Sequence, residues 1–180
     1  MELKEFREDF IDELRFNAEH DGTEPETQFI SKMLDNLEEI GELNDPYPVA
    51  VDMRGKHGRK MSFDAYAYDE ADGSLVLISS YFTNKRDEAS TLTNTLIDDM
   101  YKHMAYFVDE SVNGRVSDYC DASDNAINLA KEFSKKIGKG IQKLADLSFT
   151  YCLMQFSANR SKALKRKICL IVRSKFVFGL

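Results

Sequence analysis

The sequence has few cysteines, no long apolar run and no internal repeat, and each absence excludes a class of protein. Its 180 residues include three scattered cysteines without paired spacing, so neither a disulfide framework nor a zinc site is expected. The longest apolar run falls far short of the roughly 18–20 residues that a membrane-spanning helix needs. The charged N-terminus, MELKEFREDF, does not have the pattern of a signal peptide. We therefore expect a cytoplasmic protein that does not bind a membrane.

The hydrophobic content is sufficient for a folded core. With 43% hydrophobic and 11% aromatic residues, a chain of this length can bury one, and residues 1–180 are predicted to form a single domain. The chain ends on the apolar run ICLIVRSKFVFGL without a polar tail, which favours a fragment or a short version of a longer protein. We expect Phe176 and Phe178 to be buried in the core or against a neighbouring chain.

The formal net charge of −7 hides a strong division of charge along the chain. Residues 1–127 contain 12 Lys/Arg and 29 Asp/Glu, whereas residues 128–180 contain 12 and 2. Either two oppositely charged layers partly neutralise each other, or the basic end forms a phosphate-binding face. The basic residues cluster in the segment NRSKALKRK, at Arg160, Lys162, Lys165, Arg166 and Lys167. If DNA or RNA binds there, we expect electrostatic binding without base stacking, because no aromatic residue is interleaved.

Two strands over residues 61–68 and 75–82 form the predicted centre of the fold. The first alternates apolar and other residues, and the second is apolar on both faces, which is typical of a central, covered strand. An Asp-Gly pair at 72–73 supplies the turn. If Asp69 pairs with Ser74, Asp64 lies opposite Ser79, and its carboxylate points toward hydroxyl side chains.

Helical periodicity predicts two helices before this hairpin and two after it. The first covers residues 2–19, and the second runs from Thr23 to Ile40, where Thr23 and Glu26 have capping-box spacing. A short extended stretch follows and ends in the polar turn RGKHGRK. The third helix is expected to start within 87–90 and the fourth at 124. Strands are predicted at 146–156, in the same sheet as the hairpin, and at 168–180.

This order of elements resembles the N-terminal region of the AIPR, or abortive infection phage resistance, proteins, over most of the chain. The resemblance rests on Glu26 and Phe29 in the second helix, on Asp64 in FDAYAYDEADGSLVLISSYF, and on the later strand with its basic segment. The first domain of that family is related to the Mrr-like branch of the PD-(D/E)xK nucleases. The resemblance implies an α/β fold with a three-layer, restriction-endonuclease-like arrangement, in which helices flank a central mixed sheet.

The nuclease chemistry that the resemblance implies needs a helix carboxylate, a strand Asp and an acid-x-Lys motif on the next strand. Glu26 and Asp64 match the first two as candidate or remnant catalytic and metal-binding residues. Ser79 and Tyr81 stand where the second carboxylate and the lysine belong, and no Lys or Arg lies between Asp64 and Lys85. Each acid also has a simpler interpretation: Glu26 as a helix cap, and Asp64 as a solvated strand carboxylate.

We therefore expect a phage-defence domain on a catalytically degenerate nuclease scaffold that binds nucleic acid or a phage component. On this interpretation the chain is not an enzyme and needs no cofactor. One alternative is an active DNA or RNA endonuclease with a migrated motif, which would require Mg²⁺ or Mn²⁺ and would use Lys85 or the C-terminal basic segment. The other alternative is a structural module that forms a homo-oligomer and has no site.

Overall fold

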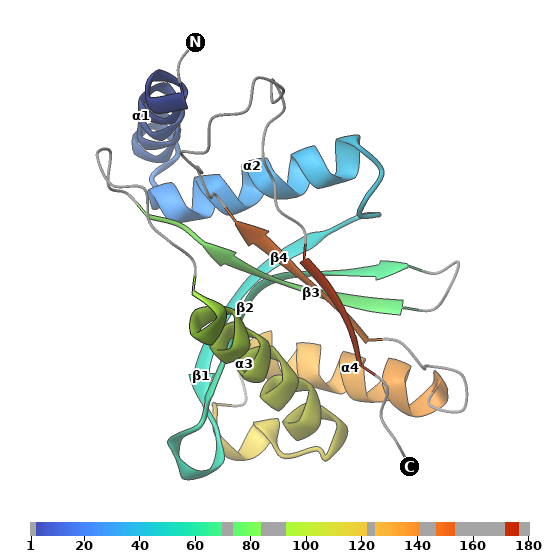
Figure 1. The fold of residues 1–180 in the computed structure, drawn as a ribbon. Helices are drawn as coiled ribbons and strands as arrows, with labels where there is room; N and C mark the ends of the chain where they lie inside the picture. The colour runs from blue at the N-terminus through green and yellow to red at the C-terminus, as the bar shows by residue number, and fades with distance from the viewer. Residues whose placement is uncertain are drawn as a thin grey trace.

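The chain folds as a mixed α/β structure around a five-stranded sheet (Figure 1). A computed structural model describes residues 3–69, 74–83, 93–121, 125–140, 147–153 and 172–176, and the side chains of 5–68, 75–83, 93–121 and 125–135. The strands are β1 (Tyr47–Arg54), β2 (Lys60–Asp69), β3 (Ser74–Tyr81), β4 (Leu147–Leu153) and β5 (Val172–Phe176). They lie in chain order across the sheet. Neighbours are antiparallel except β3 and β4, which are parallel.

The predicted hairpin is present and has the predicted register. Strands β2 and β3 pair from Ala65 with Ile78 to Asp69 with Ser74. Strand β3 is the central strand of the sheet, and the adjacent residues Leu77 and Ile78 are both buried, as expected for a strand covered on both faces. Strand β4 lies directly beside β3, which confirms that the later predicted strand joins the same sheet.

All four predicted helices are present. They are α1 (Leu3–Asp21), α2 (Pro25–Glu39), α3 (Asn94–Val112) and α4 (Asn125–Gly140), with two short 3-10 turns, η1 (Lys56–Gly58) and η2 (Val116–Asp118). The prediction that the third helix starts within 87–90 is wrong. Thr93 has an extended backbone, and its hydroxyl caps α3 by accepting a hydrogen bond from the Leu96 N–H at 3.3 Å. No helix in the described part of the chain is long and apolar enough to cross a bilayer.

Helices cover both faces of the sheet, α1 and α2 on one side and α3 and α4 on the other (Figure 1). Successive residues of β3 show this division, because side chains alternate between the faces of a strand. Leu77 belongs to the core under α3 and α4, whereas Ile78 belongs to the core under α2. The mixed α/β class predicted from the sequence is therefore confirmed.

The core under α3 and α4 is the larger one, and aromatic rings form its centre. Phe133 of α4 is fully buried, and its ring centroid lies 5.8 Å from that of Phe107 on α3. It also lies 6.3 Å from the ring of Phe63 and 5.5 Å from that of Tyr66, both on β2. Full burial of a side chain of this size stabilises the fold by about 1.5–3 kcal/mol.

The core under α2 is smaller and contains no aromatic ring. Leu34 and Leu37 of α2 pack on Ala65, Ala67 and Ile78. The short side chains of β2 leave room for the helix leucines, so this core is filled by fewer and smaller groups, and the rings of Phe10, Phe29 and Phe82 form a separate cluster beside it. The two cores thus give the two faces of the same sheet a different composition.

Candidate functional site

Asp64 lies at an irregular point of β2. The β2–β3 ladder ends at the pair Ala65 and Ile78, so Asp64, the preceding residue of β2, has no partner in it. On the other side, the β1–β2 pairing shifts register between Pro48 and Val51, so two residues of β1 face Asp64. One of them, Ala50, has φ +47°, a left-handed conformation that is uncommon for a residue other than glycine. Such β-bulges bend a strand and re-aim its side chains, and they occur often beside functional sites.

The irregularity changes the direction of the side chains around Asp64. Phe63 and Tyr66 both pack in the core under α3 and α4 although they are three positions apart, and Ala65 belongs to the opposite core. The regular alternation of β2 is therefore interrupted at Asp64. The sequence predicted that Asp64 pairs with Ser79, but this pair is not part of the β2–β3 ladder. Instead the Asp64 carboxylate accepts a hydrogen bond from the backbone N–H of Ser80 at 2.5 Å.

The charge of Asp64 acts on Glu26. Burial raises the pKa of Asp64, and this effect is opposed by the hydrogen bonding from Ser80 and by the positive charge of Lys60. Burial also raises the pKa of Glu26, and the negative charge of Asp64 raises it further. A partly buried pair of like charges is an arrangement that a bound cation or proton relieves. The structure therefore brings the two sequence-predicted acids into one electrostatic neighbourhood.

Glu26 does not serve as a helix cap. The N-cap of α2 is Glu24, and no side chain accepts a capping hydrogen bond there. The predicted capping box of Thr23 and Glu26 is therefore wrong. The Thr23 hydroxyl instead accepts a hydrogen bond from the Gln28 side chain at 3.1 Å. Glu26 stands in the first turn of α2, where the helix dipole favours a carboxylate.

The positions expected for the acid-x-Lys motif are occupied by packing residues. Ser79 is buried, and Tyr81 packs against the core under α3 and α4. On the opposite face, Phe82 stacks on Phe29 of α2, with ring centroids 5.1 Å apart. Neither face of this strand end carries a carboxylate and a lysine. Among the described residues, no group of three His, Cys, Asp or Glu side chains is placed to hold a metal ion.

Lys60 is a functional candidate that the sequence reasoning missed. It lies four positions before Asp64 on β2, and its positive charge lowers the pKa of Asp64. Its ammonium group also forms an ion pair with Asp52 on β1, at 3.4 Å. The sequence KMSFD contains a signal for this placement. Because Met61 and Phe63 are buried, the alternating residues of the same strand, including Lys60, point away from that core.

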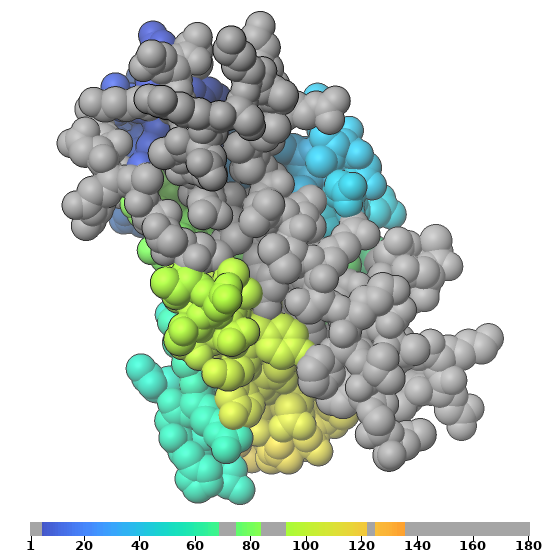
Figure 2. Space-filling model, in the orientation of Figure 1, coloured from blue at the N-terminus to red at the C-terminus, as the bar shows by residue number. Residues whose placement is uncertain are grey.

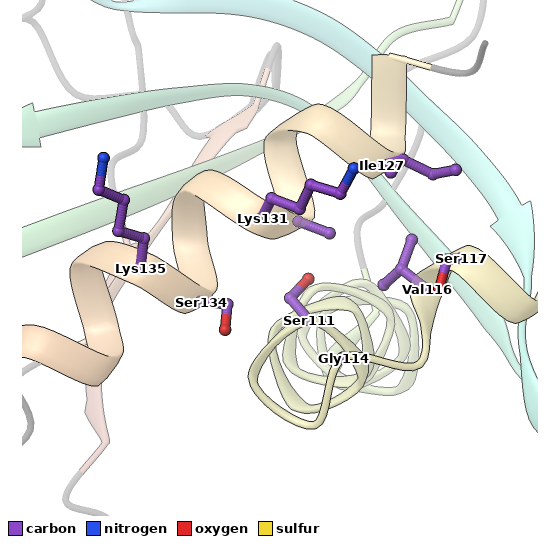
Figure 3. Close-up of a pocket in the computed structure, with 9 residues that line it drawn as sticks. Ser111, Gly114, Val116, Ser117, Ile127, Lys131, Ser134 and Lys135 are labelled. Carbon is purple, nitrogen blue, oxygen red and sulfur yellow. The ribbon is translucent and has the colours of Figure 1, made fainter. Parts of the chain in front are cut away.

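A pocket of about 260 Å³ lies between the end of α3 and α4 (Figure 3). Its polar lining consists of three hydroxyls and two ammonium groups, and none of the nine lining residues is acidic. Ser134 points from α4 toward the end of α3, where Ser111 lies (Figure 3). The Ser111 hydroxyl donates to the Phe107 carbonyl at 2.6 Å, so the available donors are Ser117, Ser134 and the two lysines. These lysines, Lys131 and Lys135, are four positions apart and share one face of α4.

The C-terminal basic cluster cannot be placed beside this pocket. Residues 154–171, which include Arg160, Lys162, Lys165, Arg166 and Lys167, lie outside the described residues. The expected burial of Phe176 and Phe178 concerns side chains that also lie outside them. Both expectations stay predictions.

The comparisons with known proteins give one match. Residues 29–164 match the family model described as the abortive infection phage resistance protein N-terminal domain. No curated protein and no solved structure matches the chain. The matched range includes Asp64, the β2–β3 hairpin, α3 and α4, and it begins three residues after Glu26.

Proposed function

This chain belongs to the abortive infection phage resistance family, and on that premise we propose that its nuclease-like scaffold binds nucleic acid without cutting it. Family membership implies a role in phage defence. A defence protein has to recognise or act on a component of the infection, and nucleic acid is the component that suits a basic face. The proposal therefore concerns the ligand and the loss of cleavage.

The nuclease-like scaffold is supported by the positions of two acids. Asp64 lies on a strand of the central hairpin, and Glu26 lies in the first turn of a helix on the same side as the smaller core. The effect of the Asp64 charge on the pKa of Glu26 supports a common site. Helices on both faces of a sheet with a parallel β3–β4 pair are compatible with the three-layer, restriction-endonuclease-like arrangement. The assignment rests on this placement and on the family's relationship to Mrr-like nucleases.

The loss of cleavage is the central part of the proposal, and the packing of Tyr81 carries it. A lysine in that position would stabilise the charge that develops on the phosphate or polarise the attacking water. Tyr81 instead packs against the core under α3 and α4. Ser79 is buried, and its neutral hydroxyl lacks the negative charge with which a carboxylate binds a divalent metal ion. Two of the four functional groups are therefore absent from their expected positions.

Nucleic-acid binding is supported by the basic character of the C-terminal third. The pocket lined by Lys131 and Lys135 offers ammonium and hydroxyl donors without a carboxylate to compete for them. The five basic residues at 160–167 would extend this positive field if they lie on the same side. Binding of this kind is electrostatic, insensitive to sequence and strongly weakened by salt.

An active metal-dependent endonuclease is the second candidate function, and the neighbourhood of Asp64 favours it. Mg²⁺ is commonly held by one or two carboxylates together with substrate phosphates, a number that Glu26 and Asp64 can provide. Lys60 acts electrostatically on Asp64 and is the described cation best placed to substitute for the missing lysine. In this alternative Mg²⁺ or Mn²⁺ would bring phosphate and water together, and Lys60 would neutralise developing charge.

Fluorescence anisotropy with labelled single-stranded and duplex DNA and with RNA, at several salt concentrations, tests the binding. Replacing Lys165, Arg166 and Lys167 with Ala is expected to lower the log-log salt slope by up to about three units, because each phosphate contact contributes about 0.9 on duplex DNA. The variant Lys131→Gln/Lys135→Gln should lower it by up to about two units. Unchanged slopes in both variants would mean that these residues form an ordinary solvated surface. The single variant Arg15→Gln on α1 is the control for loss of charge.

A further inference from the structure

The tip of the β1–β2 hairpin, residues 54–60, concentrates positive charge within the acidic part of the chain. Its sequence, RGKHGRK, holds four of the 12 Lys and Arg residues of the first 127 positions and no acidic residue. These four are Arg54, Lys56, Arg59 and Lys60. Such a density is unexpected in a region whose Asp and Glu residues outnumber its basic residues more than twofold. It marks the tip as a candidate contact for an anion.

The backbone of the tip is held in one shape. The Gly55 N–H donates to the Arg59 carbonyl at 2.8 Å, and the Gly58 N–H donates to the Gly55 carbonyl at 3.1 Å. His57 has φ +60°, a left-handed conformation that is rare outside glycine. A Cβ on Gly55 would lie 2.9 Å from the terminal methyl of Met61, so the base of the tip packs closely against that side chain. The basic side chains therefore start from fixed positions, which reduces the entropy lost when a ligand binds.

Within the described residues, most of the basic side chains of the tip form no ion pair with a carboxylate. Lys60 is paired with Asp52. The Arg59 guanidinium lies 4.7 Å from the ring centroid of Tyr106, a contact that fixes its position and keeps its charge. Arg54 donates to the Gly58 carbonyl at 3.1 Å, and Lys56 is exposed. Arg54 and Arg59 thus keep their charge without an ion pair to a described carboxylate, whereas the exposed Lys56 also acts on Glu110 of α3, whose pKa its positive charge lowers.

The tip is continuous with the strand that carries Asp64. Figure 2 shows it, in teal, projecting at the lower end of the molecule beside the residues of α3. Lys60 is the first residue of β2, and Asp64 follows on the same strand. The tip contains no apolar side chain that could enter a lipid bilayer. A polyanion with regularly spaced charges therefore fits it better than a membrane surface does.

We propose that residues 54–60 are a second nucleic-acid contact, in which Arg54, Lys56 and Arg59 bind successive phosphates of a strand that runs toward Asp64. The inference rests on the proposed nucleic-acid binding and adds a contact in the acidic part of the chain. The end of a two-stranded ribbon fits the major groove of a duplex, and its phosphate contacts would also suit a single strand. The contacts are electrostatic, so they position the ligand without reading its sequence.

The test compares Lys56→Gln with the control Arg15→Gln, which removes the same charge from α1, by anisotropy on duplex and single-stranded DNA and on RNA. Lys56→Gln should lower the salt slope by about 0.9 on a duplex or about 0.7 on a single strand, and Arg54→Gln/Lys56→Gln by about twice as much. Lys56→Arg should restore the wild-type slope. Thermal unfolding of each variant shows whether the fold is kept. Because Lys56 is exposed, Lys56→Gln is expected to disturb the fold less than the double variant does.

The outcomes separate this inference from the proposed function. If wild-type protein binds but Lys56→Gln and the double variant keep its affinity and slope, the hairpin contact is wrong and the proposed function stands. An equal loss in Arg15→Gln would also overturn the inference, because the effect would then come from net charge. If the wild-type chain binds none of the three nucleic acids at low salt, both proposals are wrong.

Discussion

The two faces of the sheet differ in the side chains that cover them and in the chemistry beside them. The face under α3 and α4 is filled with interlocking aromatic rings, whereas the core under α2 consists of three leucines, two alanines and one isoleucine, and the rings of Phe29 and Phe82 belong to a separate cluster with α1. Asp64 is half-buried, and Glu26 lies in the first turn of α2, the helix that covers the second of these faces. The comparison indicates that one face supplies most of the stability and that the other tolerates groups which are costly to bury.

The largest expected effect comes from removing an aromatic ring. Phe133→Ala should reduce the free energy of unfolding by about 3–5 kcal/mol, because its ring is fully buried among four others. Ile78→Val, on the face under α2, should cost only about 0.5–1.5 kcal/mol. Urea unfolding of the two variants measures both. Because the two substitutions remove different volumes, each loss is judged against its own range, and a loss below about 2 kcal/mol for Phe133→Ala would contradict the central place given to its ring.

An intermediate effect is expected for Glu110 on α3. Its carboxylate accepts hydrogen bonds from the Arg115 guanidinium and the Tyr119 hydroxyl, each at 2.8 Å, and the bond from Arg115 is the main cause of its lowered pKa. A lowered folded-state pKa stabilises the fold above the unfolded pKa of about 4.3, and this stabilisation is lost as the pH falls through the folded value. Glu110→Gln should therefore cost about 1–2 kcal/mol at neutral pH.

Measuring unfolding from pH 7 downward checks the sign of this effect. The difference between wild type and Glu110→Gln should shrink as the pH falls, since protonated Glu110 no longer attracts Arg115. Tyr119→Phe, which keeps the ion pair and removes one hydrogen bond, is the milder companion variant. A difference that stays constant down to the acid transition would contradict the role given to the carboxylate charge.

The smallest expected effect has the opposite sign. Because burial raises the pKa of Asp64, its ionised form destabilises the folded state at neutral pH, and this cost disappears as the pH falls below the folded value. Asp64→Asn keeps an acceptor for the Ser80 N–H without the charge. It should stabilise the fold by about 0.5–2 kcal/mol, the range common for single stabilising substitutions.

The same variant should also return the pKa of Glu26 toward its ordinary value, because the neighbouring negative charge is gone. Carboxyl NMR titration of wild type and Asp64→Asn measures this directly. If Asp64→Asn destabilises the protein at pH 7, the aspartate is a structural residue rather than a buried charge retained for a site.

The hairpin register and the four helices could be predicted because they follow from local patterns, namely strand alternation, an Asp-Gly turn and helical periodicity. The surroundings of Asp64 could not. The bulge at Val49 and Ala50 lies on a different strand, and nothing in those two residues signals a left-handed backbone. The direction of the Asp64 carboxylate therefore depends on tertiary structure and cannot be predicted from the alternation of residues within β2.

Other differences have similar causes. The spacing of Thr23 and Glu26 fits a capping box, but α2 starts two residues after Thr23, so the cap is at Glu24. The polar character of the turn RGKHGRK was predicted, but the position of its Arg59 side chain depends on the Tyr106 ring of α3, which is distant in the sequence. Lys60 was not predicted as a functional residue, because the nuclease motif places its lysine on the strand after Asp64. Lys60 lies before Asp64 on the same strand, and its charge lowers the pKa of Asp64.

The most direct test of the central claim is whether the protein cleaves DNA. Plasmid and single-stranded DNA are incubated with wild type and Asp64→Ala in Mg²⁺ and in Mn²⁺, and binding is measured in parallel. We predict salt-sensitive binding by both proteins and no cleavage by either. Metal-dependent cleavage by wild type that is abolished in Asp64→Ala, and equally in Lys60→Gln, would contradict the account and establish an active nuclease with a displaced lysine.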